Sequence, residues 1–205
     1  MPNRLFVQPA RATGLAILFP GLTYSCDLPV LHYPYRLLAQ RGFDVLQLQT
    51  DYTHESFQTA SPSEQADWLA SDAIAALHAS RRQRDYARVV LIGKSLGTLV
   101  LAHMLARGEE RDAATIWLTP LLRQPDLLEV ALQCKSPALF VIGTEDRSYD
   151  PKTLERIQAV SCARVLVLEG ADHILEVPGD IFSSLRRIES LLRAIDDFLD
   201  SLSID

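Results

Sequence analysis

Cysteine is scarce in this sequence: three residues among 205, placed far apart at Cys26, Cys134 and Cys162. An odd number of widely spaced cysteines, with no Cys-x-x-Cys pair, provides neither a disulfide framework nor the ligand spacing of a zinc site. We therefore expect no metal site built on these residues, and a reducing cytoplasm is the simplest compartment for the chain.

Long apolar runs and an excess of basic residues are missing as well. The first clear apolar run, Leu15–Phe19, is far shorter than the ~20 residues that span a bilayer, and the N-terminal residues lack the layout of a signal peptide. The 20 basic residues are outnumbered by 26 acidic ones, which gives a net charge of −6. Because nucleic-acid binding requires a basic surface, we expect no nucleic-acid partner. From the short apolar runs and the missing signal peptide, we expect no membrane span and a cytoplasmic location.

Linkers rich in Gly, Ser or Pro and internal repeats are also absent. Hydrophobic residues make up 48% and charged residues 22% of the chain, which is the balance of a folded protein rather than a disordered one. A length of 205 residues fits one domain better than two. We therefore predict a single domain over residues 1–205, and the sequence leaves its oligomeric state open.

What the sequence does contain is a regular alternation of short apolar runs with longer helical patterns. Strands are expected at residues 15–19, 43–48, 88–92, 113–118, 138–142 and 164–168. Helices are expected at 31–41, after Ser61, at 95–107, 151–159 and 181–199, and the irregular or partly helical stretch 119–136 is a candidate short cap segment. This alternation predicts an α/β fold, a three-layer sandwich with a mainly parallel sheet of about six or seven strands and helices on both faces.

In such sheets, function gathers at the carboxyl ends of the strands. One loop at that edge holds the run Gly93-Lys94-Ser95-Leu96-Gly97, between a buried strand and a helix. A G-x-S-x-G run in this position places the serine on a turn so sharp that its hydroxyl projects and the flanking positions must be glycine. We therefore predict that Ser95 is a nucleophile; the alternative is a serine that only caps the following helix.

A serine nucleophile needs a base and an orienting carboxylate. Among the five histidines, His173 follows the last strand at the active edge and is our candidate base, while His32 and His54 lie in or near the same edge without further support. Asp146 follows the preceding strand and is the candidate acid. Its neighbours Glu145 and Asp150 remain alternatives.

The residue order Ser95, Asp146, His173 is that of the α/β-hydrolases. From about Leu15 to Leu199, the sequence resembles this superfamily, and it is most similar to small members without an inserted cap, such as dienelactone-hydrolase-like and carboxylesterase-like proteins. The motifs that carry the resemblance are Gly93–Gly97, Gly143-Thr144-Glu145-Asp146 and Gly170-Ala171-Asp172-His173. The resemblance implies a catalytic triad and an eight-stranded ancestral sheet, although little precedes Leu15 here.

Acyl transfer also needs donors for the tetrahedral oxyanion. The backbone amide of Leu96 is one candidate, and the amide of Leu22 in the loop after the first strand is the other, with Gly21 allowing close approach. Proline stands at position 20, where the family often carries histidine; an ordinary Pro-Gly turn is the alternative reading. The further candidate pocket residues are Thr23, Tyr24, Ser25, Cys26, Asp27, Lys94, Pro120 and Leu121.

These residues predict a serine hydrolase that cleaves a small carboxylic ester or thioester through an acyl-enzyme intermediate, with no cofactor. Lys94 either favours an anionic substrate or lies against solvent. A non-catalytic binding protein on the same fold is the main alternative, and another reaction, such as that of a lyase or haloperoxidase, is a third.

Overall fold

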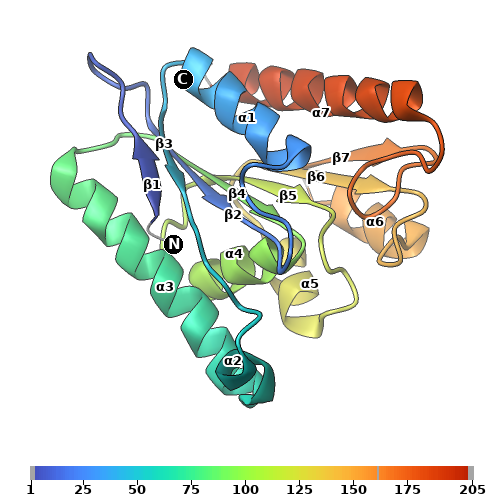
Figure 1. Ribbon diagram of the computed structural model, residues 1–205, viewed down its shortest axis with the longest axis horizontal. Helices are drawn as coiled ribbons and strands as arrows, with labels where there is room; N and C mark the ends of the chain where they lie inside the picture. Colours follow the sequence, from blue (N-terminus) through green and yellow to red (C-terminus); the bar gives the residue numbers. More distant parts are fainter. Residues whose placement is uncertain (1–2, 161, 203–205) are drawn as a thin grey trace.

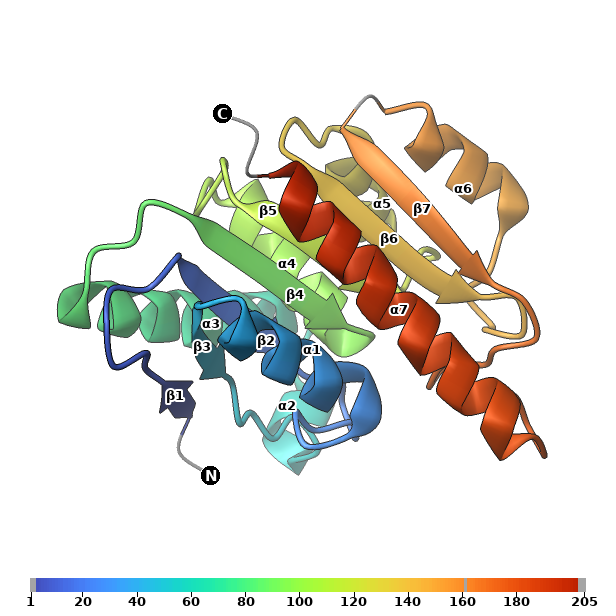
Figure 2. The same ribbon diagram turned by 90° about the horizontal axis from the view of Figure 1, so that it is seen from above.

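The computed structural model describes residues 3–160 and 162–202 and contains a seven-stranded sheet (Figures 1 and 2). The strand order is β1-β3-β2-β4-β5-β6-β7, in which β1 pairs antiparallel with β3 and all other neighbours are parallel. The strands are β1 (Arg4–Phe6), β2 (Leu15–Phe19), β3 (Asp44–Gln47), β4 (Val89–Lys94), β5 (Ala114–Leu118), β6 (Ala138–Gly143) and β7 (Ala163–Leu168). The predicted fold class and strand number are confirmed.

Helices cover both faces of the sheet. Figure 1 shows α1 (Pro29–Gln40) and α7 (Ile181–Ser201) on one face. The other face carries α3 (Pro62–Gln83), α4 (Leu96–Ala106), α5 (Pro125–Leu132) and α6 (Pro151–Gln158), with the short α2 (Glu55–Thr59) beside α3. Within the described residues, no helix is both long and apolar enough to cross a membrane.

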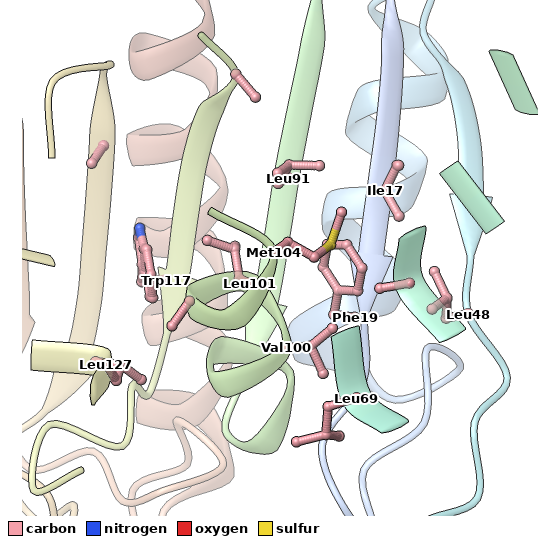
Figure 3. Packing of buried hydrophobic residues seen from close by; sticks show 14 of the residues in the cluster. Ile17, Phe19, Leu48, Leu69, Leu91, Val100, Leu101, Met104, Trp117 and Leu127 are labelled. Atoms are coloured by element: carbon pink, nitrogen blue, oxygen red, sulfur yellow. The ribbon is translucent and has the colours of Figure 1, made fainter. Parts of the chain in front are cut away.

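Two apolar cores follow from the alternation of side chains along the buried strands. Figure 3 shows the core on the α4 face, where Val100, Leu101 and Met104 pack among strand residues such as Phe19 and Trp117. The core on the opposite face joins α1 to α7. Its members include Leu31 and Leu38 of α1 and Leu191, Ile195 and Phe198 of α7. Arg41 reinforces this junction through ion pairs with Asp196 and Asp200.

Local sequence signals explain several helix boundaries. The Ser61 hydroxyl accepts from the amide of Glu64, and the Glu64 carboxylate accepts from the amide of Ser61, which is the reciprocal capping box that the sequence indicates. The first helix begins at Pro29, two residues before the expected start, because proline suits the first helical turn. The sequence reading missed α2 and left α5 as a partly helical stretch.

One buried carboxylate supports the amino end of the sheet. Asp44 is fully buried and accepts hydrogen bonds from the Tyr86 hydroxyl at 2.7 Å and from the backbone amide of Gln8 at 2.7 Å. Arg84 forms an ion pair with it at 3.2 Å. A buried carboxylate is tolerated when its oxygens are satisfied in this way.

Replacing Tyr86 by phenylalanine should destabilise the fold by about 1–3 kcal/mol, because it removes one donor from a buried charged acceptor. Chemical denaturation of wild type and variant would measure the difference. Tyr33→Phe, at an exposed tyrosine of α1, is the matched control and should change the unfolding free energy by less than about 0.5 kcal/mol. Equal stability of Tyr86→Phe and wild type would contradict the role given to this cluster.

Candidate active site

Ser95 occupies a strained turn between β4 and α4. Its backbone has φ 53° and ψ −114°, an arrangement that L-residues rarely adopt and that costs about 1–3 kcal/mol. Its amide donates to the carbonyl of Leu118 on the neighbouring strand, which fixes the turn against the sheet. Its side chain makes no capping hydrogen bond to α4, so the helix-cap reading of this serine is wrong.

The two glycines of the motif are required by space. A Cβ atom on Gly97 would lie 2.1 Å from the carbonyl oxygen of Phe19, and one on Gly93 would lie 2.5 Å from the carbonyl oxygen of Gly97. Both distances are far inside van der Waals contact with backbone atoms, which cannot move aside as a flexible side chain can. The chain therefore passes tightly around Ser95.

Ser95, His173 and Asp146 form one hydrogen-bonded chain. The Oγ atom of Ser95 lies 2.8 Å from Nε2 of His173, and Nδ1 of the same ring lies 2.7 Å from Oδ2 of Asp146. The side chain of Asp146 is fully buried, whereas that of His173 is 26% exposed. The second carboxylate oxygen of Asp146 accepts from the amide of Ser148 at 2.8 Å.

The loops that carry Asp146 and His173 are joined through their backbones. The amide of Glu145 donates to the carbonyl of Ala171, and the amide of Gly170 donates to the Thr144 hydroxyl. A Cβ atom on Gly143 would lie 1.9 Å from the carbonyl oxygen of Ala171, so this glycine permits the close approach of the two loops. Their packing holds the Asp146–His173 contact in place.

The alternative acids and bases lie elsewhere. Glu145 is exposed, and Asp150 caps α6 by accepting from the amide of Lys152. His54 pairs with Asp51 on the surface. His32 packs edge-on against Tyr33 and Tyr35, His78 pairs with Glu109, and His103 lies along α4.

The backbone amides of Leu96 and Leu22 have no protein acceptor among the described residues. The amide of Leu96 lies at the start of α4, where the helix dipole favours negative charge. The amide of Leu22 is free in the same sense, whereas the neighbouring amide of Gly21 is bound to the carbonyl of Tyr24. The sequence analysis predicts these two amides as the hydrogen-bond donors to an oxyanion.

Lys94 is almost completely buried, with 2% of its surface exposed, so the reading that placed it against solvent is wrong. Its Nζ atom lies 4.5 Å from the centre of the Tyr24 ring. Burial lowers the pKa of the Lys94 ammonium from 10.5 to about 8, an effect that the charges of Asp146 and Asp172 oppose. Sequence reasoning missed this contact, because no pattern in the chain joins positions 24 and 94.

The other pocket candidates divide between surface and core. Thr23 is exposed, Leu121 is half-buried and Pro120 is buried. Cys26 does not line a pocket, which corrects the sequence prediction: its thiol points into the core and lies 3.6 Å from the carbonyl oxygen of Leu48. Burial raises the pKa of this thiol to about 12, so it is not a nucleophile at neutral pH.

The turn that follows β5 is attached to the serine turn. Thr98 of α4 donates from its hydroxyl to the carbonyl of Ser95 at 2.6 Å and accepts from the amide of Leu121 at 3.4 Å. Thr119, at the start of this turn, is buried with φ 44°, and its hydroxyl has no partner among the described residues. Sequence reasoning did not single out Thr98, since a helical threonine carries no local signal of such a contact.

Metal-binding geometry is not found at this edge or elsewhere in the described chain: residues 3–160 and 162–202 contain no group of three or more His, Cys, Asp or Glu side chains arranged to hold an ion. A hydroxyl, an imidazole and a carboxylate in hydrogen-bonded series suit nucleophilic attack and proton transfer.

Known proteins match this chain over most of its length. Among solved structures, an alpha/beta serine hydrolase homologue from Coxiella burnetii is 16% identical, with a TM-score of 0.72 and 94% of this chain and 90% of that chain covered. A serine hydrolase without a lid from Xanthomonas campestris is 18% identical, with a TM-score of 0.70 and coverage of 99% and 89%. A dienelactone hydrolase from Anabaena variabilis is 19% identical, with a TM-score of 0.67 and coverage of 97% and 90%.

At these identities, the likeness to solved structures concerns the fold. The family is shown by a sequence model described as an alpha/beta hydrolase domain, which matches residues 23–200. That match includes the serine turn, the Asp146 loop and the His173 loop. The chain belongs to the alpha/beta hydrolase family.

Proposed function

We propose that this alpha/beta hydrolase cleaves a carboxylic ester or thioester through a covalent acyl-enzyme. The observation that carries the proposal is the unbroken chain from Ser95 Oγ through His173 to the buried Asp146, with distances of 2.8 and 2.7 Å. Hydrogen-bond reach between nucleophile, base and orienting acid is the geometric requirement of this chemistry.

Each residue has one task in the proposed reaction. His173 takes the hydroxyl proton as Ser95 attacks the carbonyl carbon, and it gives this proton to the leaving alcohol or thiol. Asp146 holds the imidazole in the tautomer that leaves Nε2 free to accept and stabilises the imidazolium. The amides of Leu96 and Leu22 donate to the oxyanion. His173 then takes a proton from a water molecule, which attacks the acyl-enzyme and releases the carboxylic acid and Ser95.

Two further observations favour turnover over a binding role. The backbone of Ser95 is held in a strained conformation, and such strain concentrates at functional sites. The similar solved structures include proteins described as a serine hydrolase without a lid and a dienelactone hydrolase. Both descriptions accord with small substrates that reach an uncapped serine.

Ser95→Ala should abolish labelling by a fluorophosphonate probe and lower hydrolysis by about 10⁴-fold or more, because the attacking atom is removed. Gel fluorescence after labelling and a panel of short- and long-chain p-nitrophenyl esters and thioesters measure the two effects. Ser71→Ala, an exposed serine of α3, is the matched control and should behave as wild type.

Labelling that persists in Ser95→Ala would refute the assignment of the nucleophile. The competing hypothesis, a binding protein that kept the fold without turnover, predicts wild-type hydrolysis no faster than that of His173→Ala across the whole panel. The ratio of rates on matched oxygen and thiol esters then identifies the leaving group.

A further inference from the structure

The feature that the proposed reaction leaves unexplained is the buried side chain of Lys94. It follows Gly93 at the carboxyl end of β4 and points to the face covered by α1 and α7. Among the described residues its ammonium makes no hydrogen bond and no ion pair, and it lies over the Tyr24 ring. A lysine side chain that is 2% exposed and has no ion pair is costly to the fold, so its presence beside Ser95 requires a reason.

Lys94 lies where three loops of the site meet. Its own backbone precedes Ser95. Its side chain runs beneath Gly21, since a Cβ atom there would lie 3.4 Å from its Cδ, and ends over the ring of Tyr24. The backbone oxygen of Tyr24 accepts a hydrogen bond from the amide of Gly21, which closes this loop. The cation therefore supports the loop that presents the Leu22 amide.

The charges around Lys94 come from the other two loops. Asp146 and Asp172 attract its ammonium and Arg147 repels it. Burial raises the pKa of Tyr24 to about 12, and the charges of Glu176 and Asp172 act in the same direction. The Asp172 carboxylate is held by the amides of Ile174 and Glu176, so its position is fixed. The cation thus lies between the aromatic ring on one side and the acid and base loops on the other.

We propose that Lys94 is a positioning residue of the hydrolase: its protonated ammonium holds the 20–24 loop against the loops of Asp146 and His173, and loss of its proton slows the acylation of Ser95. This inference rests on the proposed function. The positive charge favours the developing oxyanion, and its contact with Tyr24 depends on the charge because a neutral amine is not attracted to the ring face.

The sign of the pH effect separates this role from simple unfolding. With a folded-state pKa near 8 and an ordinary value of 10.5, Lys94 is protonated in both states below pH 8. Between these two values, the unfolded chain binds more protons, so the contribution of Lys94 to stability rises with pH. Activity should therefore fall through pH 8 while this contribution to the stability of the fold improves.

The test compares wild type, Lys94→Met and Lys94→Arg over pH 6–10 by kcat, KM and the rate of fluorophosphonate labelling. Wild-type kcat/KM should decline above pH 8. Lys94→Met should have kcat about tenfold lower at neutral pH, with little change in KM and no alkaline decline, since charge interactions in partly buried sites shift rates by roughly this factor. Lys94→Arg should keep most of the neutral activity and extend it to higher pH.

Several outcomes would overturn the inference. A wild-type kcat/KM that stays level from pH 7.5 to 9.5 would contradict the inference on its own. A Lys94→Met variant with wild-type kcat at neutral pH would also contradict it. A loss confined to KM for carboxylate-bearing esters, compared with neutral esters of the same shape, would instead make Lys94 a substrate contact. An active wild type with an unaffected Lys94→Met refutes this inference alone, whereas a wild type that neither labels nor hydrolyses refutes the proposed function with it.

Discussion

Asp146→Asn should lower kcat/KM by about 10⁴-fold while the protein stays folded. The reason lies in the two oxygens of the carboxylate. One of them accepts from the amide of Ser148 at 2.8 Å, so the side-chain oxygen of asparagine must take that place. Its NH₂ group then faces Nδ1 of His173 and can only donate. The imidazole is forced into the tautomer with a proton on Nε2, which cannot accept a proton from Ser95.

Steady-state kinetics on the best ester of the panel, with thermal unfolding as a check on folding, measure this effect. Glu145→Gln is the matched control, because it makes the same acid-to-amide change one residue away on an exposed side chain. It should retain activity within about twofold. If Asp146→Asn retained more than a tenth of wild-type activity, Asp146 would not be the orienting acid.

Gly143→Ala should destabilise the protein by about 3 kcal/mol or more and remove most of its activity. The added Cβ would lie 1.9 Å from the carbonyl oxygen of Ala171 and 2.5 Å from its carbonyl carbon. Backbone atoms cannot yield as a side chain does, so the acid loop and the base loop must separate. That separation would break the contact between Asp146 and His173 as well as the pairing of the loops.

Thermal or denaturant unfolding and ester hydrolysis together test this expectation. Gly179→Ala is the control: no atom lies within 4 Å of its added Cβ, and only the positive φ of 79° opposes it. Its cost should be about 1 kcal/mol with activity retained. Equal destabilisation in the two variants would mean that the clash at Gly143 costs no more than the strained φ at Gly179, and would contradict the role given to the close approach of the loops.

The parallel sheet was predictable because its central strands are buried on both faces. The sequence of such a strand is a continuous apolar run, as in Val89–Ile92. The strand β1 was not predicted, since an edge strand with one neighbour needs few apolar residues. Helix α2 escaped prediction because its five residues are too few to show a periodic stripe. Its only buried side chain is Phe57.

The candidate site was predictable to the extent that its residues follow strands. Ser95, Asp146 and His173 each stand after a strand at one edge of a parallel sheet, so topology brings them together whatever the intervening chain does. The surroundings of Lys94 depend on side-chain direction and on how three loops pack. These are tertiary properties, and the local sequence around positions 24 and 94 does not predict them.

The junction of α1 with α7 has a consequence for the order of folding. Arg41 and Asp196 are 155 residues apart in the chain, and the apolar face of α1, which lies on β2 and β3, also packs against α7. The contacts between α1 and α7 therefore cannot form until the residues of α7 have been synthesised. Contacts of such long sequence separation form slowly, because a large loop must close first. Until α7 docks, the part of this sheet face that α7 covers, over β6 and β7, stays exposed to chaperones, and a frameshift that removes α7 would leave that part exposed permanently.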